Sequence, residues 1–443
     1  MKAIASLSWL ALLPLAAWQS PSKAVNPRVS QIVEGVSEKR IEAIIKKLES
    51  FETRNTFSDG AAAARNWIKQ EFEGYSPRLQ VRFDPHSVEK KGNFFRDGEV
   101  VNVVAVLPGR TDRQIIVSGH YDSLNMTARN NEKAATAPAP GVCDDGSGTA
   151  AVMELARVMS AHEWDNTVVF IAFDAEEYGL LGSTRYANQA KKDGHKIEAV
   201  LNNDIIGTDT DGRGRTDNRA VRVFSGDPAD SPSRQLARYV REVSARYLPA
   251  MRVDTIFLPD RFGRGGDHTP FHRQGFAGVR FTTPAENYAH QHTATDTFAN
   301  VSVPYTAMVA RVNAAAAASL ALAPKAPVTS RVATSGAQKG RPGPNLSRGT
   351  GRGGYDARLG WSNENPDPDL AGYAIVWRAT TSPYWEHEIW VGNVSEYTLK
   401  DVSIDDRVFG VKAIDKEGNE SMVAAYGPAP FTAGRPPAGP VTP

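Results

Sequence analysis

The chain of 443 residues contains a single cysteine, Cys143, and almost no net charge. One thiol excludes an internal disulfide, and we expect Cys143 to be a small packing residue. The 51 basic and 50 acidic residues leave a formal net charge of +1. This balance argues against a nucleic-acid partner. The chain is longer than one ordinary domain, and its apolar content suffices for a large core.

The sequence also lacks an apolar run that favours a membrane span. Its longest candidate, residues 3–17, is short and is broken by Pro14. Lys2 precedes this run, and small and polar residues follow it, which is the order of a signal peptide. We predict a signal peptide over residues 1–24, cleaved after Ala17 or Ala24, and hence a secreted or periplasmic protein with no membrane span after cleavage. An uncleaved anchor is the alternative.

Six short segments carry the side chains that a pair of divalent metal ions needs. Imidazole nitrogens and carboxylate oxygens both bind zinc, and a catalytic zinc site leaves a position open for water. Several of the segments stand at the ends of apolar runs that are typical of strands. The segments are 119–123, 143–148, 173–177, 203–204, 266–268 and 292–297.

Each segment also has a structural interpretation when it is taken alone. His120 ends an apolar, β-branched run, where a histidine is more often structural than a ligand. Asp122 is two residues further on, so extended chain places both side chains on one face. The carboxylate could then orient the imidazole ring. Asp144 and Asp145 precede two glycines and a helical pattern, which also suits a helix N-terminus.

The run 168–173 favours a metal site over a purely structural role. Its continuous apolar sequence is typical of a strand buried on both faces. It leads directly into Asp174, Glu176 and Glu177. Acids buried beside such a strand are costly unless a cation compensates them. A second apolar run repeats the pattern and ends at Asp204.

These segments, in this order, resemble the zinc-dependent exopeptidase family of the bacterial leucyl aminopeptidases and, more distantly, the glutamate carboxypeptidases. The resemblance covers about residues 40–322, and the stretch 174–183 is especially specific. It implies two zinc ions and a cis peptide bond between Asp144 and Asp145. It also implies these roles: His120 and Asp204 on one metal, Glu177 and His292 on the other, Asp144 as the bridge, Glu176 as the general base, and Asp122 as the partner of His120.

Three positions near the last segments stay open. Many relatives carry a tyrosine where this chain has Gln291. Tyr288 could act as the oxyanion donor instead, but a rim or core position is the better interpretation. His290 competes with His292 for the ligand role, although the sequence after His292 favours the latter. We expect Asp267 to be a structural helix N-cap, since Pro270 follows it closely; His268 is left without a role.

The periodicity predicts an α/β fold for residues 26–322, with a mixed, mostly parallel sheet sandwiched by helices, as in the zinc exopeptidase fold. Residues 125–140 are expected to form a loop at the rim of the site. Ligands in such folds bind at the carboxyl ends of the strands, where the candidate metal residues fall. The predicted helices are 26–50, 60–73, 147–162, 180–192, 231–247 and 304–322, and the predicted strands are 78–84, 101–107, 115–119, 168–173, 199–204, 221–225 and 277–282.

The composition changes after residue 322. Residues 323–354 are basic, contain no acid and are rich in Gly, Pro and Ser, which predicts a linker or a long loop. From residue 355 the pattern is all strand, and its motifs resemble a fibronectin type III domain. We therefore predict a C-terminal immunoglobulin-like sandwich over residues 323–432 and a tail over 433–443. Its first strand is placed at 328–334, with 336–354 as a loop.

The sequence thus predicts an exported enzyme with two zinc ions that hydrolyses peptide or protein substrates, most consistent with an aminopeptidase. A free α-amine seeks carboxylates and open metal positions, whereas a terminal carboxylate seeks arginine. Arg261, Arg264 and Arg280 are candidates for the latter, but the sequence ties none of them to the metals. The alternatives are a carboxypeptidase or other amide hydrolase, a glutaminyl-cyclase-like transferase, and a catalytically silent receptor-like protein. Contact with a surface or a polysaccharide is one expectation for the C-terminal module.

Overall fold

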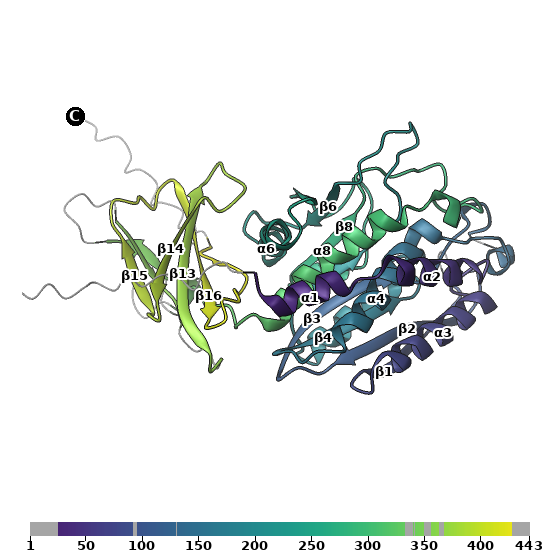
Figure 1. Ribbon diagram of the computed structural model, residues 1–443, viewed down its shortest axis with the longest axis horizontal. Helices are drawn as coiled ribbons and strands as arrows, with labels where there is room; N and C mark the ends of the chain where they lie inside the picture. The colour runs from purple at the N-terminus through teal and green to yellow at the C-terminus, as the bar shows by residue number, and fades with distance from the viewer. Residues whose placement is uncertain are drawn as a thin grey trace, which may run out of the picture.

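The computed structural model describes residues 25–91, 95–129, 131–332, 340, 342–349, 356–362 and 367–427. The predicted signal peptide (1–24) and tail (433–443) lie outside these residues. The described chain forms a large sheet flanked by helices, followed by a region made only of strands (Figure 1). This arrangement confirms the predicted fold class.

Most predicted elements are present with shifted ends. The helices are α1 (Pro27–Gly35), α2 (Glu38–Glu49), α3 (Asp59–Tyr75), α4 (Ser147–Met159), α5 (Leu181–Lys192), α6 (Pro232–Tyr247), α7 (His268–Arg273) and α8 (Val303–Leu322). The strands of the large sheet are β1 (Gln80–Val88), β2 (Gly98–Leu107), β3 (Thr111–His120), β4 (Asn166–Phe173), β5 (Lys196–Asn203), β6 (Ala220–Ser225), β7 (Arg252–Ile256) and β8 (Gly278–Thr282).

The large sheet has the order β1-β2-β4-β3-β5-β8-β6-β7. Among the described strands, four neighbouring pairs are parallel, namely β4 with β3, β3 with β5, β5 with β8 and β6 with β7. The other three pairs are antiparallel. The sequence did not predict β7, because this short edge strand is only partly buried and lacks an apolar run.

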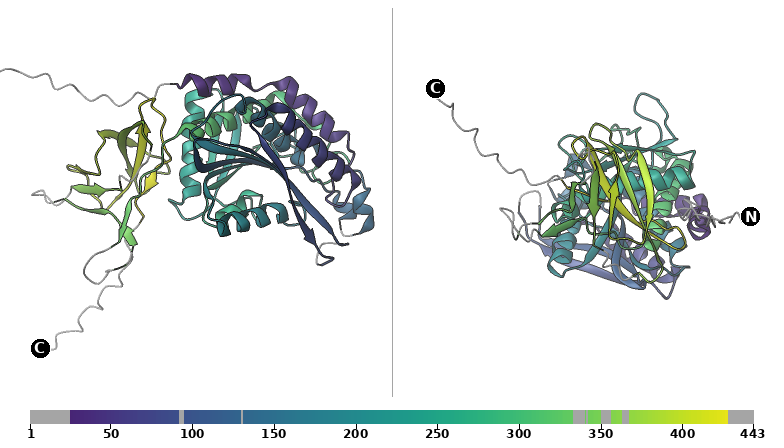
Figure 2. Two further views of the ribbon diagram at one scale, coloured as in Figure 1. Left: turned by 90° about the horizontal axis from the view of Figure 1, so that it is seen from below. Right: turned by 90° about the vertical axis from the view of Figure 1, so that its left-hand side faces the viewer.

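Alternate side chains of the central strands pack into two separate hydrophobic cores, one on each face of the sheet. Ile115 and Val117 of β3 pack with α1, α2, α3, α4, α6 and α8 on one face of the sheet. Ile116 packs on the other face with Tyr186 of α5 and Phe271 of α7. This alternation follows from the period of two in extended chain. Figure 2 shows the sheet between the two helical layers.

The single opening helix predicted over 26–50 is wrong, since the chain breaks between α1 and α2. The Ser37 side chain caps α2 by accepting a hydrogen bond from the Arg40 backbone amide. The Ser37 backbone amide in turn donates to the carboxylate of Glu154, which is buried on α4 (2.7 Å). The break is therefore fixed by a distant side chain that periodicity does not reveal.

The C-terminal region consists of antiparallel strands, which are β9 (Ser330–Val332), β10 (Pro342–Pro344), β11 (Leu346–Arg348), β12 (Ala357–Gly360), β13 (Leu370–Ala379), β14 (His387–Gly392), β15 (Glu396–Leu399), β16 (Arg407–Asp415) and β17 (Ala424–Ala425). The main sheets have the orders β11-β12-β15 and β14-β13-β16-β17. The loop predicted over 336–354 is wrong at β10 and β11. These short strands pair through the backbone and need no alternating sequence.

The C-terminal strands contact the α/β part of the chain, which contains the large sheet, along α6. Arg378 forms two hydrogen bonds to Asp230 just before α6 (2.9 and 3.0 Å), and Trp385 donates to Gln235 (3.3 Å). The Tyr239 hydroxyl donates to the Glu420 carbonyl (3.2 Å).

Across the described residues, no helix combines the length and the apolar character that membrane crossing requires.

Candidate metal centre

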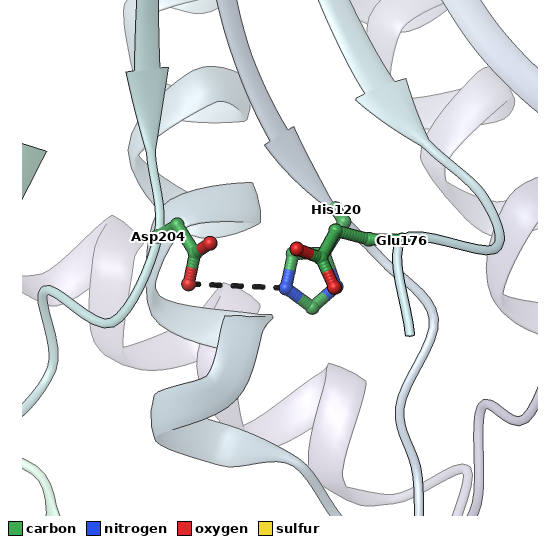
Figure 3. Close-up of side chains that lie close together, drawn as sticks. All are labelled: His120, Glu176 and Asp204. Atoms are coloured by element: carbon green, nitrogen blue, oxygen red, sulfur yellow. Dashed lines mark ion pairs between the residues drawn. The ribbon is translucent and has the colours of Figure 1, made fainter. Parts of the chain in front are cut away.

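The carboxyl ends of three neighbouring parallel strands bring the central side chains together. His120 is the last residue of β3, Asp204 follows β5, and Glu176 lies in the turn after β4. These strands are adjacent in the order β4-β3-β5. Figure 3 shows the His120 imidazole facing the Asp204 carboxylate, with Nε2 and Oδ1 4.0 Å apart. Parallel strands thus place residues that are 84 positions apart at one edge of the sheet.

The structure gathers the predicted metal residues into two groups. His120, Glu176 and Asp204 form one, and Asp144, Glu177 and His292 form the other. Within each group the candidate ligand atoms all lie within 4.8 Å of one another.

Asp144 lies between the two groups. Its Oδ1 is 3.2 Å from Nε2 of His120, and its Oδ2 is 3.1 Å from Nε2 of His292. His292 is also 3.1 Å from Oε2 of Glu177. Each oxygen of one carboxylate therefore faces a different histidine, which is the arrangement that a bridging ligand needs.

The adjacent glutamates diverge into the two groups. Glu177 is buried and lies against His292, whereas Glu176 is partly exposed and lies with His120 and Asp204. The sequence placed both glutamates directly after a buried strand. It did not predict that Glu176 would be close enough to His120 and Asp204 to share a cation.

Three segments of the site contain a residue other than glycine with left-handed backbone. They are Ala175, Ile205 and His292, with φ of 57°, 60° and 55°. Such conformations cost about 1–3 kcal/mol each and persist only where the surroundings impose them. Each one turns the chain at, or directly beside, a candidate metal residue.

Asp122 connects two parts of the site, but not entirely as predicted. Nδ1 of His120 is 3.1 Å from the backbone carbonyl oxygen of Asp122 and 3.4 Å from its carboxylate. The carboxylate accepts hydrogen bonds from the backbone amides of Glu176 (3.1 Å) and Glu177 (3.3 Å). Asp122 therefore orients His120 mainly through its carbonyl oxygen, and it holds the glutamate turn with its side chain.

Two further carboxylates fix the backbone around Asp144. Asp145 accepts hydrogen bonds from the amides of His120 (3.1 Å), Gly148 (2.9 Å) and Ile205 (3.2 Å). Asp296 accepts from the amides of Cys143 and Asp144, both at 3.0 Å. The peptide bond between Asp144 and Asp145 is cis, as the resemblance implied.

Glycine is required where this turn meets β5. A Cβ atom added at Gly148 would lie 2.6 Å from the carbonyl oxygen of Asn203 and would also clash with the Asp145 carboxylate. This close approach explains why the chain has glycine at position 148. Cys143 is buried beside the turn, and burial raises the pKa of its thiol well above the usual value, as expected of a packing residue.

Two buried arginines support the site, and the sequence did not predict either role. Arg54 donates to the backbone carbonyls of Tyr121 (2.6 Å) and Gly141 (2.7 Å), which flank the metal segments. Burial lowers the pKa of Arg54 to about 10, against the opposing effect of Asp296 and neighbouring acids. Arg280, a candidate binder of a substrate carboxylate, is instead fully buried and pairs with Asp204 (2.9 Å) and Asp260 (3.0 Å).

Asp267 stands at the N-cap position of α7, as predicted, but it does not cap the helix with its side chain. Its side chain makes no capping hydrogen bond at α7, and both carboxylate oxygens are buried without a hydrogen-bond partner among the described residues. Burial raises its pKa to about 7, while His120 opposes the shift. Asp267 is therefore the N-cap residue by position, and its buried carboxylate interacts electrostatically with His120.

The remaining candidate residues lie outside the two groups. Nε2 of His268 is 2.8 Å from the Pro259 carbonyl oxygen, and Nδ1 of His290 is 2.9 Å from the Thr295 hydroxyl. His290 therefore does not replace His292. Tyr288 is 63% exposed and lines a neighbouring cavity with Arg222 and Glu286, which fits a rim position.

The donor set fits a pair of divalent metal ions. Oε1 of Glu177 is buried and has no hydrogen-bond partner among the described residues. Nε2 of His120 is buried and forms no well-aligned hydrogen bond, although Asp144 lies 3.2 Å away. Buried polar atoms normally have partners, so each of these atoms has an unused coordination position. Two imidazoles with several carboxylates are also the ligand types that zinc prefers.

The two groups form the floor of a cavity of about 340 Å³. Asp144, Glu176, Glu177, Asp204 and His292 contribute to the floor. The 258–266 segment and the turn after β4 form walls, together with Arg129 from the 125–140 loop. That loop was predicted to lie at the rim.

Residues 102–317 match the sequence pattern of peptidase family M28. A probable zinc metalloprotease of Pyricularia oryzae is 36% identical over 465 residues, which cover 93% of this chain and 88% of the relative. The chain belongs to peptidase family M28. The prediction of a zinc metallopeptidase is thereby confirmed, while exopeptidase specificity, the leucyl aminopeptidase subfamily and the fibronectin-like module stay predictions.

Solved structures agree with the M28 assignment at the level of the fold. The LapA aminopeptidase of Legionella pneumophila superposes with a TM-score of 0.53 and 22% identity, over 68% of this chain and 77% of that one. A glutaminyl cyclase of Fimbriiglobus ruber superposes with a TM-score of 0.50 and 20% identity, over 63% and 94%. The fold alone therefore does not separate a peptidase from a cyclase.

Zinc binding to this M28 site is predicted to release protons. Burial lowers the pKa of His292, but Glu177 and Asp144 raise it to about 11. Burial also opposes the charged form of His120, whereas Asp122 and Asp144 raise its pKa well above the usual value. Both histidines then carry a proton at neutral pH without metal, and they must lose it to bind zinc.

We expect zinc uptake at about pH 7.5 to release at least the two histidine protons, with further protons from acids such as Glu176 whose pKa is raised, and with affinity that strengthens as pH rises. Calorimetry in buffers of different ionisation enthalpy measures the number. His292→Ala should release about one proton fewer. A heat of binding that does not depend on the buffer would contradict protonated histidines in the metal-free protein.

Proposed function

We propose that the chain is an exported aminopeptidase with two zinc ions, which releases N-terminal residues from peptides. The observation that carries the proposal is the placement of Asp144 between two groups of candidate ligands, 3.2 Å from His120 and 3.1 Å from His292. Membership of family M28 supports the peptidase activity. The N-terminal sequence supports export, and the C-terminal strands are proposed to form a fibronectin type III-like accessory module.

In this proposal His120 and Asp204 hold one zinc ion, Glu177 and His292 hold the other, and Asp144 bridges them. When bound, the metal pair would supply Lewis-acid polarisation of the scissile carbonyl and lower the pKa of a water molecule. Asp122 orients the His120 imidazole, and Asp122 and Asp145 fix the backbone of the site through hydrogen bonds to its amides.

Glu176 is proposed as the general base. It lines the cavity and is partly exposed, whereas Glu177 is buried against His292. Burial is the largest cause that raises the pKa of Glu176, and neighbouring carboxylates add to it while His120 opposes it. A carboxylate with a raised pKa can accept a proton from the attacking water and return it to the leaving amine.

The arrangement of residues also bears on the rival functions. A catalytically silent receptor would not need the complete ligand set and the base gathered at one cavity. A glutaminyl-cyclase-like transferase is expected to use one metal, which the intact pair of His120 and Asp204 disfavours. A carboxypeptidase gains support from Arg261 and Arg264, which line the same cavity as the acids. It is the second candidate.

Glu176→Gln is expected to keep both zinc ions and to lower turnover by about 10²–10⁴-fold, since only the base is lost. Asp144→Asn should lose zinc as well as activity, because it removes the bridge. Zinc content and steady-state kinetics of the two variants measure the difference. Near-normal turnover of Glu176→Gln would show that another group accepts the proton.

An aminoacyl anilide with a free α-amine is expected to be cleaved, and its N-acetylated form should be a far poorer substrate. The amine is a cation at neutral pH and is attracted to the acids of the cavity, whereas the acetylated nitrogen is neutral. Release of the aniline is measured for both substrates. Equal cleavage, or release of residues only from the C-terminus of a peptide, would favour the carboxypeptidase.

A further inference from the structure

The cavity beside the two metal groups has a cationic wall. Three guanidinium groups line it, from Arg129, Arg261 and Arg264. Among the described lining residues, Leu180 provides the single apolar side chain. A pocket that selects an apolar substrate residue is lined mainly by apolar side chains. These walls therefore match a charged substrate group better than a leucine-like one.

The acids of the floor do not neutralise this wall once metal is present. Four carboxylates line the cavity, from Asp144, Glu176, Glu177 and Asp204. Two divalent cations carry as many positive charges as these four acids carry negative ones. The four acids then do not neutralise the arginines, so the arginine wall favours an anion, while the carboxylates and open metal positions of the floor remain available to an amine.

Arg261 has such partners. Its side chain is 10% exposed, and it is 3.1 Å from Asp260 and 2.9 Å from Glu286. Glu286 is buried and also binds Arg222 (2.7 Å). Arg261 is thus committed to holding the 258–266 segment in place.

Arg264 differs from Arg261. Within the described chain, its one carboxylate partner is Glu286 at 3.8 Å, which already binds Arg222 and Arg261 at shorter distances. The Arg264 side chain is 33% exposed. Arg264 lines the same cavity as Asp144 and Asp204. Burial opposes its charge, but Asp144 and Glu286 raise the pKa of Arg264. Arg264 therefore keeps capacity for a new anion, which Arg261 does not.

Arg129 stands at the turn after β4. Its Nη2 donates to the Glu177 carbonyl (2.8 Å), its Nε is buried without a partner, and it has no carboxylate partner among the described residues. The 261–265 segment approaches that turn, because a Cβ atom at Gly265 would lie 3.5 Å from Leu180. Arg129 and Arg264 therefore line the same cavity from two adjacent segments, the turn after β4 and residues 261–265.

We propose that Arg264 binds a carboxylate on the substrate residue adjacent to the scissile bond, so that the enzyme prefers anionic substrates. This proposal rests on the proposed function. The carboxylate can come from an acidic N-terminal side chain or from the free C-terminus of a dipeptide. In both cases the guanidinium provides the planar donor geometry that suits a carboxylate.

Two matched pairs of substrates separate these sources. The first pair is glutamyl and glutaminyl anilide, which differ in charge but hardly in shape. The second is alanyl-alanine and its C-terminal amide. We expect kcat/KM of the zinc-loaded enzyme to favour the charged member of one pair by about 10–100-fold, as is typical of a charge-assisted hydrogen bond. The pair that shows the preference identifies the source of the carboxylate.

Arg264→Gln should reduce this ratio to near one, and Arg264→Lys should retain part of it. Arg213→Gln is the matched control, because Arg213 is exposed and lines the neighbouring cavity. It should leave the ratio unchanged. Zinc content and circular dichroism show whether the variants are folded.

Equal rates within both pairs, or a preference that survives Arg264→Gln, would overturn the proposal. Absence of hydrolysis of all four compounds would instead overturn the proposed function. The same four compounds are then compared by binding to the zinc-loaded protein. Tighter binding of a charged member that Arg264→Gln abolishes supports the role of Arg264, and equal binding contradicts it.

Discussion

Repulsion among buried carboxylates is the constraint on which the arrangement of this site depends. Asp122, Asp144, Asp145, Asp204 and Asp267 are all buried near one edge of the sheet. Isolated buried charges are so costly that the groups take up protons or find cations. Burial raises the pKa of Asp267 to about 7 and that of Asp145 well above the usual value. The protein thus provides some relief by itself, and two bound cations would relieve the acids that line the cavity.

Residues around the site balance the buried acids and fix the backbone that carries them. Arg54 lies beneath the Asp144 turn and binds backbone carbonyls, while Arg280 pairs with Asp204 from the middle of the sheet. Asp122, Asp145 and Asp296 use their oxygens on backbone amides and not on the candidate ligands alone. Truncating one partner of such a buried pair leaves an unpaired charge, which is strongly destabilising. The ligand positions are therefore held by groups that do not themselves bind metal.

The sequence predicted the parts of this site that are encoded locally. Strand ends followed by acids predicted that His120, Glu177 and Asp204 lie at one edge of the sheet, and the resemblance to a peptidase family supplied the proposed bridging role of Asp144. What could not be predicted depends on contacts between distant segments. Arg54 bonds to residues 67 and 87 positions away. Arg280 resembles any arginine in a strand until its neighbours are known. Asp267 has the sequence context of a cap, yet its side chain makes no capping hydrogen bond. The break between α1 and α2 depends likewise on Glu154, 117 residues from Ser37.

The proposed function depends on one carboxylate, Asp144, joining two cation sites. Anomalous diffraction from crystals of the zinc-loaded protein measures this directly. We predict two zinc peaks about 3.5–4 Å apart, one beside His120 and Asp204 and one beside Glu177 and His292, with an oxygen of Asp144 bound to each. A single fully occupied peak, or a second zinc ion that does not contact Asp144, would contradict it.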